Sequence, residues 1–235
     1  MTKPFRFKQF TIVQEKSPMK VGTDSVLLGA WCNGSKAMNI LDIGTGTGIL
    51  ALLMAQRFSA SQVTAIEVNP AAYEEAVYNV ASSPWSDRIH LINRDLINFS
   101  TDEKFDLVIA NPPFFHSDLK SHQTGKATAR HATDFNINSF ANSTKWLSPN
   151  GRLAGVYPVD IFQKFKSEMD LLGFHPLRIM KVHATPEKSP HRILFEFSGQ
   201  KTCNTDIDSI VIESKGRHGY SEKYRELTKD FYLNF

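Results

Sequence analysis

The chain alternates short apolar runs with longer segments in which apolar residues recur every three or four positions. Short runs are typical of buried strands, and the longer periodic segments are typical of helices packed against a sheet. Strands are expected at residues 39–43, 62–68, 88–95, 105–110, 151–158, 174–182, 191–197 and 208–213. Helices are expected at residues 48–58, 70–81, 136–147 and 160–172. The second of these begins at Pro70, because proline is favoured in the first turn of a helix.

The order of these elements indicates the fold class. Strands that alternate with helices predict an α/β fold with a doubly wound, mostly parallel sheet. The last strands follow one another without a helix between them, which predicts an antiparallel strand at the edge. The sequence contains no internal repeat or low-complexity linker, so we expect a single domain over residues 1–235. Its core would span residues 37–213, with an N-terminal extension at 1–36 and a C-terminal tail at 214–235.

Composition restricts the location and the partners. The chain has 235 residues, of which 41% are hydrophobic and 22% are charged, as in soluble proteins. We expect neither a secretory leader nor a membrane span, because the N-terminus lacks an apolar core segment and no run of roughly 18 apolar residues occurs. The two cysteines, Cys32 and Cys203, are far apart and lack the spacing of metal ligands, which favours the cytoplasm and no metal site. The net charge of +3 permits a polyanionic partner without requiring one.

The stretch "LDIGTGTG" places Gly44, Gly46 and Gly48 between an expected strand and an expected helix. Glycines there allow a tight turn and a close approach of the backbone to a ligand. The dinucleotide-binding pattern G-x-G-x-x-G is not met, because position 49 is Ile49. The pattern, with Asp42 just before the loop, instead resembles motif I of Rossmann-like methyltransferases that use S-adenosylmethionine. The resemblance implies that Asp42 helps to anchor the methionine end of this cofactor.

Two further acids end expected strands. Glu67 ends the second strand, where a carboxylate can accept hydrogen bonds from both ribose hydroxyls. Asp95 ends the third strand and matches the acid that these enzymes use near the adenine amino group, with the backbone of Leu96 beside it. Glycines at such a turn can also serve packing alone, and acids at strand ends can cap helices. Three acids at successive strand ends, together with the loop, favour cofactor binding.

The tetrapeptide Asn-Pro-Pro-Phe at residues 111–114 ends the fourth expected strand. The side-chain oxygen of Asn111 and the carbonyl of Pro112 provide two acceptors suited to a planar primary amine, and the prolines hold the backbone stiff. Phe114 offers a ring on which a base could stack. Two acceptors on the amine protons would direct the nitrogen lone pair toward the methyl group, so catalysis would rest on positioning and electrostatics. The tetrapeptide resembles motif IV of amino-group methyltransferases.

The flanking segments narrow the resemblance. These are residues 5–31, "ARHA" at 129–132, "GVYP" at 155–158 and the ending "KDFYLNF" at 229–235. With them the chain resembles the bacterial tRNA1(Val) adenine-N6 methyltransferase family, although tyrosine is usual there in place of Phe114. The resemblance implies a Rossmann-like class I fold with a seven-stranded sheet, and methylation of adenine 37 beside the anticodon. It also implies that Thr23 and Asp24, which open a helix in the N-terminal extension, pack over the methionine end of the cofactor.

The partner is predicted from charge and from this resemblance. Lys120, Lys126 and Arg130 lie in the loop after the tetrapeptide and are expected to meet phosphates of the tRNA anticodon loop, although they could also form an ordinary solvated loop. Motif IV also serves protein glutamine-N5 methyltransferases of release factors and guanine-N2 methyltransferases of rRNA. A catalytically silent RNA- or cofactor-binding module is the alternative without enzyme activity. A monomer is favoured, with the oligomeric state left open.

Overall fold

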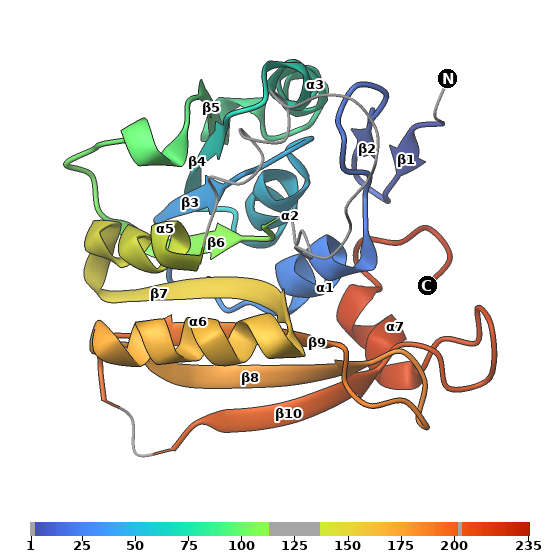
Figure 1. Ribbon diagram of the computed structural model, residues 1–235. Helices are drawn as coiled ribbons and strands as arrows, with labels where there is room; N and C mark the ends of the chain where they lie inside the picture. Colours follow the sequence, from blue (N-terminus) through green and yellow to red (C-terminus); the bar gives the residue numbers. More distant parts are fainter. Residues whose placement is uncertain (1–2, 113–136, 202–203) are drawn as a thin grey trace, which may run out of the picture.

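A twisted central sheet runs through the computed structural model, which describes residues 3–112, 137–201 and 204–235 (Figure 1). Its strands are β3 (Asn39–Ile43), β4 (Gln62–Glu67), β5 (Ile89–Asn93), β6 (Phe105–Ala110), β7 (Leu147–Pro158), β8 (His175–His183), β9 (Arg192–Ser198) and β10 (Asp206–Val211). All eight coincide with apolar runs that the sequence pattern assigned to strands. The bounds differ by a few residues, most of all at the start of β7.

Within the described ranges this sheet has eight strands, in the order β10-β8-β9-β7-β6-β3-β4-β5. Neighbouring strands are parallel except at β9, which is antiparallel to both β7 and β8. The expected class is therefore confirmed, but two details were wrong. The sheet has eight strands rather than seven, and its antiparallel strand lies inside the sheet rather than at the edge. The eighth strand is β10, which pairs in parallel with β8 along its whole length and forms the edge. Strand β9 lies inside because it pairs with both β7 and β8.

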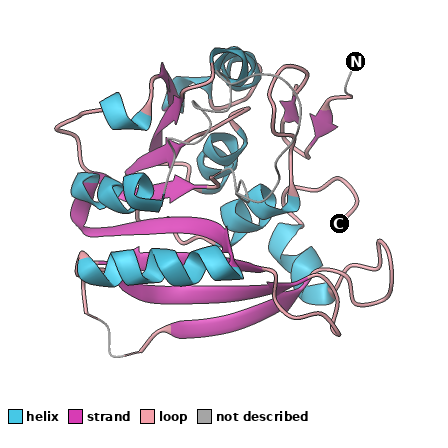
Figure 2. Ribbon diagram, in the orientation of Figure 1, coloured by secondary structure: helices cyan, strands magenta, loops and turns pink. Residues whose placement is uncertain are grey.

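Helices cover both faces of the sheet (Figure 2). On one face, α1 (Thr23–Trp31), α2 (Ile49–Arg57), α3 (Pro70–Ala81) and α7 (Glu222–Thr228) share a core with residues such as Ile40 and Leu107. On the other face, α5 (Ile137–Ala141) and α6 (Val159–Leu171) pack on residues such as Leu41 and Val108. Successive strand residues point to opposite faces. A strand buried on both faces therefore reads as a continuous apolar run, as seen in the sequence.

Local sequence signals explain where the helices begin. Helix α3 starts at Pro70, and the Asn69 side chain caps it by accepting hydrogen bonds from the amides of Ala71 and Ala72, each at 3.0 Å. Helices were expected at 48–58 and 160–172, and α2 and α6 agree with these ranges within one or two residues. The helix expected at 136–147 is instead α5 followed by a 3₁₀ turn, η3 (Asn142–Trp146).

The two ends of the chain pack against each other. The N-terminal strands β1 (Phe5–Arg6) and β2 (Thr11–Ile12) form a small hairpin, and the amide of Lys8 donates to the carbonyl of Phe231 at 2.8 Å. The ring of Phe7 stacks on Tyr232 with their centroids 6.0 Å apart. Residues from both ends belong to the same buried cluster as α1 and α2. The N-terminal extension and the C-terminal tail thus pack together on the face of the sheet that carries α1 and α2.

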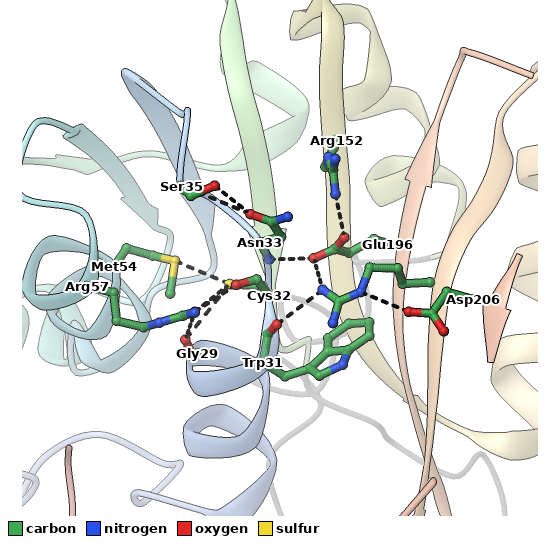
Figure 3. Close-up of polar contacts among 11 residues, drawn as sticks. Gly29, Trp31, Cys32, Asn33, Ser35, Met54, Arg57, Arg152, Glu196 and Asp206 are labelled. Atoms are coloured by element: carbon green, nitrogen blue, oxygen red, sulfur yellow. Dashed lines mark hydrogen bonds and ion pairs between the residues drawn. The ribbon is translucent and has the colours of Figure 1, made fainter. Parts of the chain in front are cut away.

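A buried carboxylate joins the end of α1 to the sheet (Figure 3). Glu196 of β9 is 0% exposed and accepts a hydrogen bond from the amide of Asn33 at 2.5 Å. It also pairs with Arg152 at 3.0 Å and with Arg178 at 3.3 Å. The Arg178 guanidinium lies over the Trp31 ring, 4.4 Å from its centroid. Two cations and one amide therefore compensate the buried charge of Glu196.

Replacing Glu196 with alanine is expected to lower the free energy of unfolding by about 3 kcal/mol, because Arg152, Arg178 and the Asn33 amide would lose their common partner. Chemical denaturation measures this change. Asp170→Ala is the control, since it breaks the exposed Lys166–Asp170 pair at 2.8 Å. That change should cost no more than about 0.5 kcal/mol. Equal losses in the two variants would contradict an anchoring role for Glu196.

Candidate active site

The loop between β3 and α2 carries the three glycines of the sequence pattern. Gly44, Gly46 and Gly48 have φ values of 69°, 59° and 85°, which lie in the left-handed region that favours glycine. Among the described residues, a Cβ atom on Gly44 or Gly46 would meet no other atom within 4 Å, whereas one on Gly48 would lie 3.6 Å from Ala76 and Val80. Gly44 and Gly46 therefore border open space at the carboxyl edge of the sheet. At Gly48 a Cβ atom would make only ordinary contacts with α3, so the left-handed φ is what favours glycine there.

Asp42 lies beneath this loop and is 0% exposed. Its Oδ2 atom accepts hydrogen bonds from the Thr45 hydroxyl at 2.5 Å and from the Ala51 amide at 3.0 Å. Its Oδ1 atom is buried and has no hydrogen-bond partner among the described residues. Burial raises the pKa of Asp42 to about 7, and the hydrogen bond from Thr45 opposes this shift. Asp42 thus holds the glycine loop and the start of α2 through hydrogen bonds to Oδ2, and its Oδ1 atom remains an unused acceptor among the described residues.

Glu67 ends β4 and ties two turns together. It is 8% exposed, and its two carboxylate oxygens accept from the amides of Gly46 and Asn69, each at 2.8 Å. Burial raises the pKa of Glu67, while these backbone hydrogen bonds oppose the rise. Each carboxylate oxygen still has a lone pair that could accept another hydrogen bond. The side chain is therefore fixed beside the glycine loop with acceptor capacity to spare.

Asp95 follows β5 at the same edge and caps the 3₁₀ turn η2 (Leu96–Asn98). Its carboxylate accepts from the amide of Ile97 at 2.9 Å, and both Asp95 and Leu96 are half-buried. Asp95 therefore caps a turn, which is the alternative role that the sequence pattern allowed for an acid at a strand end. Two apolar side chains that the sequence analysis did not single out are exposed in these turns, Val68 by 48% and Ile97 by 61%. They follow neighbouring strands, β4 and β5, shortly after the two acids.

An N-terminal segment, residues 13–21, crosses α3 beside the glycine loop. The amide and carbonyl of Val13 both bond to the Asn79 side chain, at 2.8 and 2.9 Å. The same side chain donates to the carbonyl of Thr47 at 2.9 Å. Glu75, one helical turn earlier, accepts from two amides of the segment at 2.5 and 2.7 Å. The sequence analysis did not predict a role for Glu75 or Asn79. The pattern that could have indicated one is two polar residues four positions apart on the buried face of the helix.

Asn111 directly follows β6, and its side chain meets the first turn of α1. Its Nδ2 atom donates to the hydroxyl oxygen of Ser25 at 2.7 Å. Its Oδ1 atom is buried and has no hydrogen-bond partner in the described part of the chain. Pro112 is also buried. The first two residues of the tetrapeptide are thus held at the carboxyl edge, and Ser25 is a neighbour that sequence analysis did not predict.

The residues expected to open the N-terminal helix do so. Thr23 is the first residue of α1 and is exposed. Asp24 pairs with Arg192 of β9 at 2.8 Å, and both side chains are partly exposed. The ion pair joins the first turn of α1 to the sheet and compensates the Asp24 charge.

Four predicted residues, Phe114, Lys120, Lys126 and Arg130, lie outside the described residues. Among those that are described, no three histidine, cysteine or acidic side chains are grouped as metal ligands. The described helices are all too short or too polar to cross a membrane. A cavity of about 570 Å³ lies against β3, β4 and β5 and is lined by residues such as His90 and Glu103. No predicted site residue lines it.

The glycine loop, the acids at successive strand ends and the doubly wound sheet together define a Rossmann-like class I methyltransferase. Solved structures have the same fold. A predicted O-methyltransferase from Agrobacterium tumefaciens superimposes with a TM-score of 0.65 at 20% identity, covering 88% of this chain and 96% of that one. A ribosomal protein L11 methylase from Lactobacillus delbrueckii has a TM-score of 0.53 at 19% identity, covering 74% of this chain and 76% of that one.

The family is shown by sequence comparison. The model of the methyltransferase small domain matches residues 17–172. Proteins named tRNA1(Val) (adenine(37)-N6)-methyltransferase from Vibrio campbellii and Phocaeicola vulgatus are 41% and 42% identical to this chain over 233 residues. The alignments cover 99% and 98% of this chain, and 96% and 97% of those proteins. The chain belongs to the tRNA1(Val) (adenine(37)-N6)-methyltransferase family, as the sequence motifs predicted.

Proposed function

We propose that this protein transfers a methyl group from S-adenosylmethionine to the N6 amine of an adenine in tRNA, namely adenine 37 of a valine tRNA. The observation that carries the reaction type is the unpartnered Oδ1 acceptor of Asn111 at the carboxyl edge of the sheet, as seen in the described residues. The target follows from the family, whose members match this chain along almost its whole length.

The residues at this edge fit the proposed cofactor. The open space beside Gly44 and Gly46 would accept the methionine end, and the unused Oδ1 atom of Asp42 lies beneath the same loop. Glu67 would accept the ribose hydroxyls. The exposed Val68 and Ile97 would flank the adenine ring with apolar surface. The full set proposed to hold the cofactor is Thr23, Asp24, Asp42, Gly44, Gly46, Gly48, Glu67, Asp95, Leu96 and Asn111.

The cofactor supplies an electrophilic methyl group, and the protein positions the nucleophile. The Oδ1 atom of Asn111 and the carbonyl of Pro112 would accept hydrogen bonds from the two N–H groups of the target amine and direct its lone pair to the methyl carbon. When bound, the cofactor would give up its methyl group by breaking the C–S bond as the N–C bond forms, with the electron pair left on sulfur. The methylated nitrogen then loses its extra proton to water. Phe114 is proposed to stack on the adenine.

The RNA is proposed to bind to the segment that contains Lys120, Lys126 and Arg130. Binding to an anticodon stem-loop should therefore weaken as salt rises, with a log–log slope of about −0.7 for each single-strand phosphate contact. Changing Lys126 and Arg130 together to alanine should flatten this slope and leave cofactor affinity unchanged. Fluorescence anisotropy at several salt concentrations measures the slope, and calorimetry measures the cofactor affinity. A slope that is the same in the double variant would exclude these cations from the RNA contact.

Transfer of a labelled methyl group to competing substrates tests the proposed function. The protein is incubated with labelled S-adenosylmethionine and one of three substrates: bulk tRNA, rRNA or a release factor. Each substrate is prepared without its natural methyl groups. We expect label in tRNA alone. Label in the release factor would identify a glutamine methyltransferase, label in rRNA would favour the guanine-N2 alternative, and cofactor binding without transfer would indicate a silent module.

Cofactor affinity should depend on pH through Asp42. Its pKa of about 7 in the free protein means that the carboxyl is largely protonated at pH 6. A cationic cofactor favours the ionised form, so binding should lower the pKa and release protons. Affinity is thus expected to rise between about pH 5.5 and 7.5, and Asp42→Asn should remove most of this dependence. Calorimetry in buffers of different ionisation enthalpy counts the protons; no proton release by the unmodified protein would contradict the assignment.

A further inference from the structure

The first turn of α1 touches the proposed catalytic amide directly. Ser25 is 7% exposed, and its hydroxyl oxygen lies 2.7 Å from the Nδ2 atom of Asn111. The two residues are 86 positions apart in the chain. The contact therefore links the N-terminal extension to the end of β6, two parts of the molecule that the cofactor loop separates in sequence.

In this structure the contact occupies the donor end of the Asn111 amide. A side-chain amide has a donor end and an acceptor end of nearly the same shape, and a serine hydroxyl can accept from the first or donate to the second. Here the donor end is bound to Ser25, and the acceptor Oδ1 is left buried without a partner among the described residues. Rotation of the amide by half a turn would offer N–H groups to the target amine, which needs acceptors. That orientation would oppose the reaction.

We propose that Ser25 is a positioning residue that holds the Asn111 side chain in the arrangement seen here, with the donor end bound and the oxygen left for the target amine. The proposal rests on the proposed function, because it assigns Ser25 a part in the same methyl transfer. It also gives the N-terminal extension a role in catalysis in addition to covering the cofactor.

The surroundings of Ser25 hold it in place. The preceding residue, Asp24, pairs with Arg192 at 2.8 Å. At the other end of α1, the amide of Asn33 bonds to the buried Glu196. Helix α1 is thus fastened to β9 at both ends. The Ser25 hydroxyl on the first turn of α1 therefore has a defined position relative to β6. A fixed partner of this kind can hold the Asn111 amide in place.

A double-mutant cycle tests the role. Ser25→Ala should lower kcat for tRNA methylation by about 10-fold, the scale of one lost hydrogen bond, with KM and cofactor affinity within about 2-fold. In an Asn111→Ala background the same change should cost less than about 2-fold, because the amide that it orients is gone. Ser61→Ala is the control: Ser61 is also buried, but it lies at the opposite edge of the sheet, where it bonds to Ala37. It should leave kcat unchanged.

A 10-fold loss in both backgrounds, or no loss in either, would overturn the proposal. A second readout needs no substrate. The side-chain amide signal of Asn111 in nitrogen-15 NMR, identified by its absence in Asn111→Ala, should shift in Ser25→Ala and not in Ser61→Ala. An unshifted signal would refute the contact even if tRNA is methylated. If the unmodified protein methylates no RNA, the proposed function fails, and the NMR signal still decides whether Ser25 orients the amide.

Discussion

Replacing Asn111 with alanine is expected to lower methyl transfer by about 100-fold or more, the scale for loss of one preorganised transition-state hydrogen bond. The change deletes the Oδ1 acceptor, which is buried and unpartnered among the described residues. Cofactor affinity should stay within a few-fold, since Gly46 and Glu67 would still hold the ligand. Single-turnover rates and calorimetry with S-adenosylmethionine measure the two effects separately.

The control for this variant is Asn39→Ala. Asn39 is an exposed asparagine at the start of β3, at the opposite edge of the sheet. Its loss should not change the rate. Near-normal turnover by Asn111→Ala would mean that the target amine lies elsewhere. A loss of cofactor affinity as large as the loss of rate would mean that the proposed contact of Asn111 with the cofactor, and not its acceptor for the target amine, accounts for the effect.

Replacing Gly46 with aspartate should weaken cofactor binding by at least about 100-fold. A Cβ atom at this position would meet no atom of the described residues within 4 Å, so the new side chain should not prevent folding. With the cofactor present, it would occupy the space proposed for the methionine end and place a negative charge against the cofactor carboxylate. Calorimetry with S-adenosylmethionine measures the loss, and thermal unfolding checks the fold.

Gly173→Asp is a matched control for backbone strain. Gly173 has a φ of 77°, and a Cβ atom there, like one at Gly46, would meet no other atom within 4 Å, but it lies in the turn between α6 and β8. Both variants should lose similar stability, about 1 kcal/mol, because both force a side chain into the left-handed region. Only Gly46→Asp should lose cofactor affinity. Equal affinity for S-adenosylmethionine in the two variants would mean that the glycine loop does not bind the cofactor.

The sequence predicted the parts of the site that depend on strand ends. Asp42, Glu67 and Asn111 lie at or beside the ends of parallel strands, and parallel strands bring their carboxyl ends to one edge of a sheet. A local pattern of apolar runs followed by polar residues was therefore enough to group them. The start of α3 was also predictable, because Pro70 is a local signal.

Other features depend on contacts between distant segments, which no local pattern records. Ser25 is one of several small polar residues before the first strand of the central sheet, and only packing of α1 beside β6 makes it a partner of Asn111. The roles of Glu75 and Asn79 depend on their hydrogen bonds to the N-terminal segment and to the glycine loop, which both lie far from them in the sequence. The place of β9 inside the sheet follows from its pairing with both β7 and β8. Alternation within a strand gives its faces but not its neighbours.

The central claim is that this active site methylates N6 of adenine 37 in a valine tRNA. The most direct measurement is mass spectrometry of nuclease fragments from tRNA lacking this modification, after incubation with the protein and isotope-labelled S-adenosylmethionine. We predict one labelled methyl group, recovered as N6-methyladenosine in the fragment that contains position 37, and none with Asn111→Ala. Label on another nucleoside, in another fragment, or equally with Asn111→Ala would contradict the account.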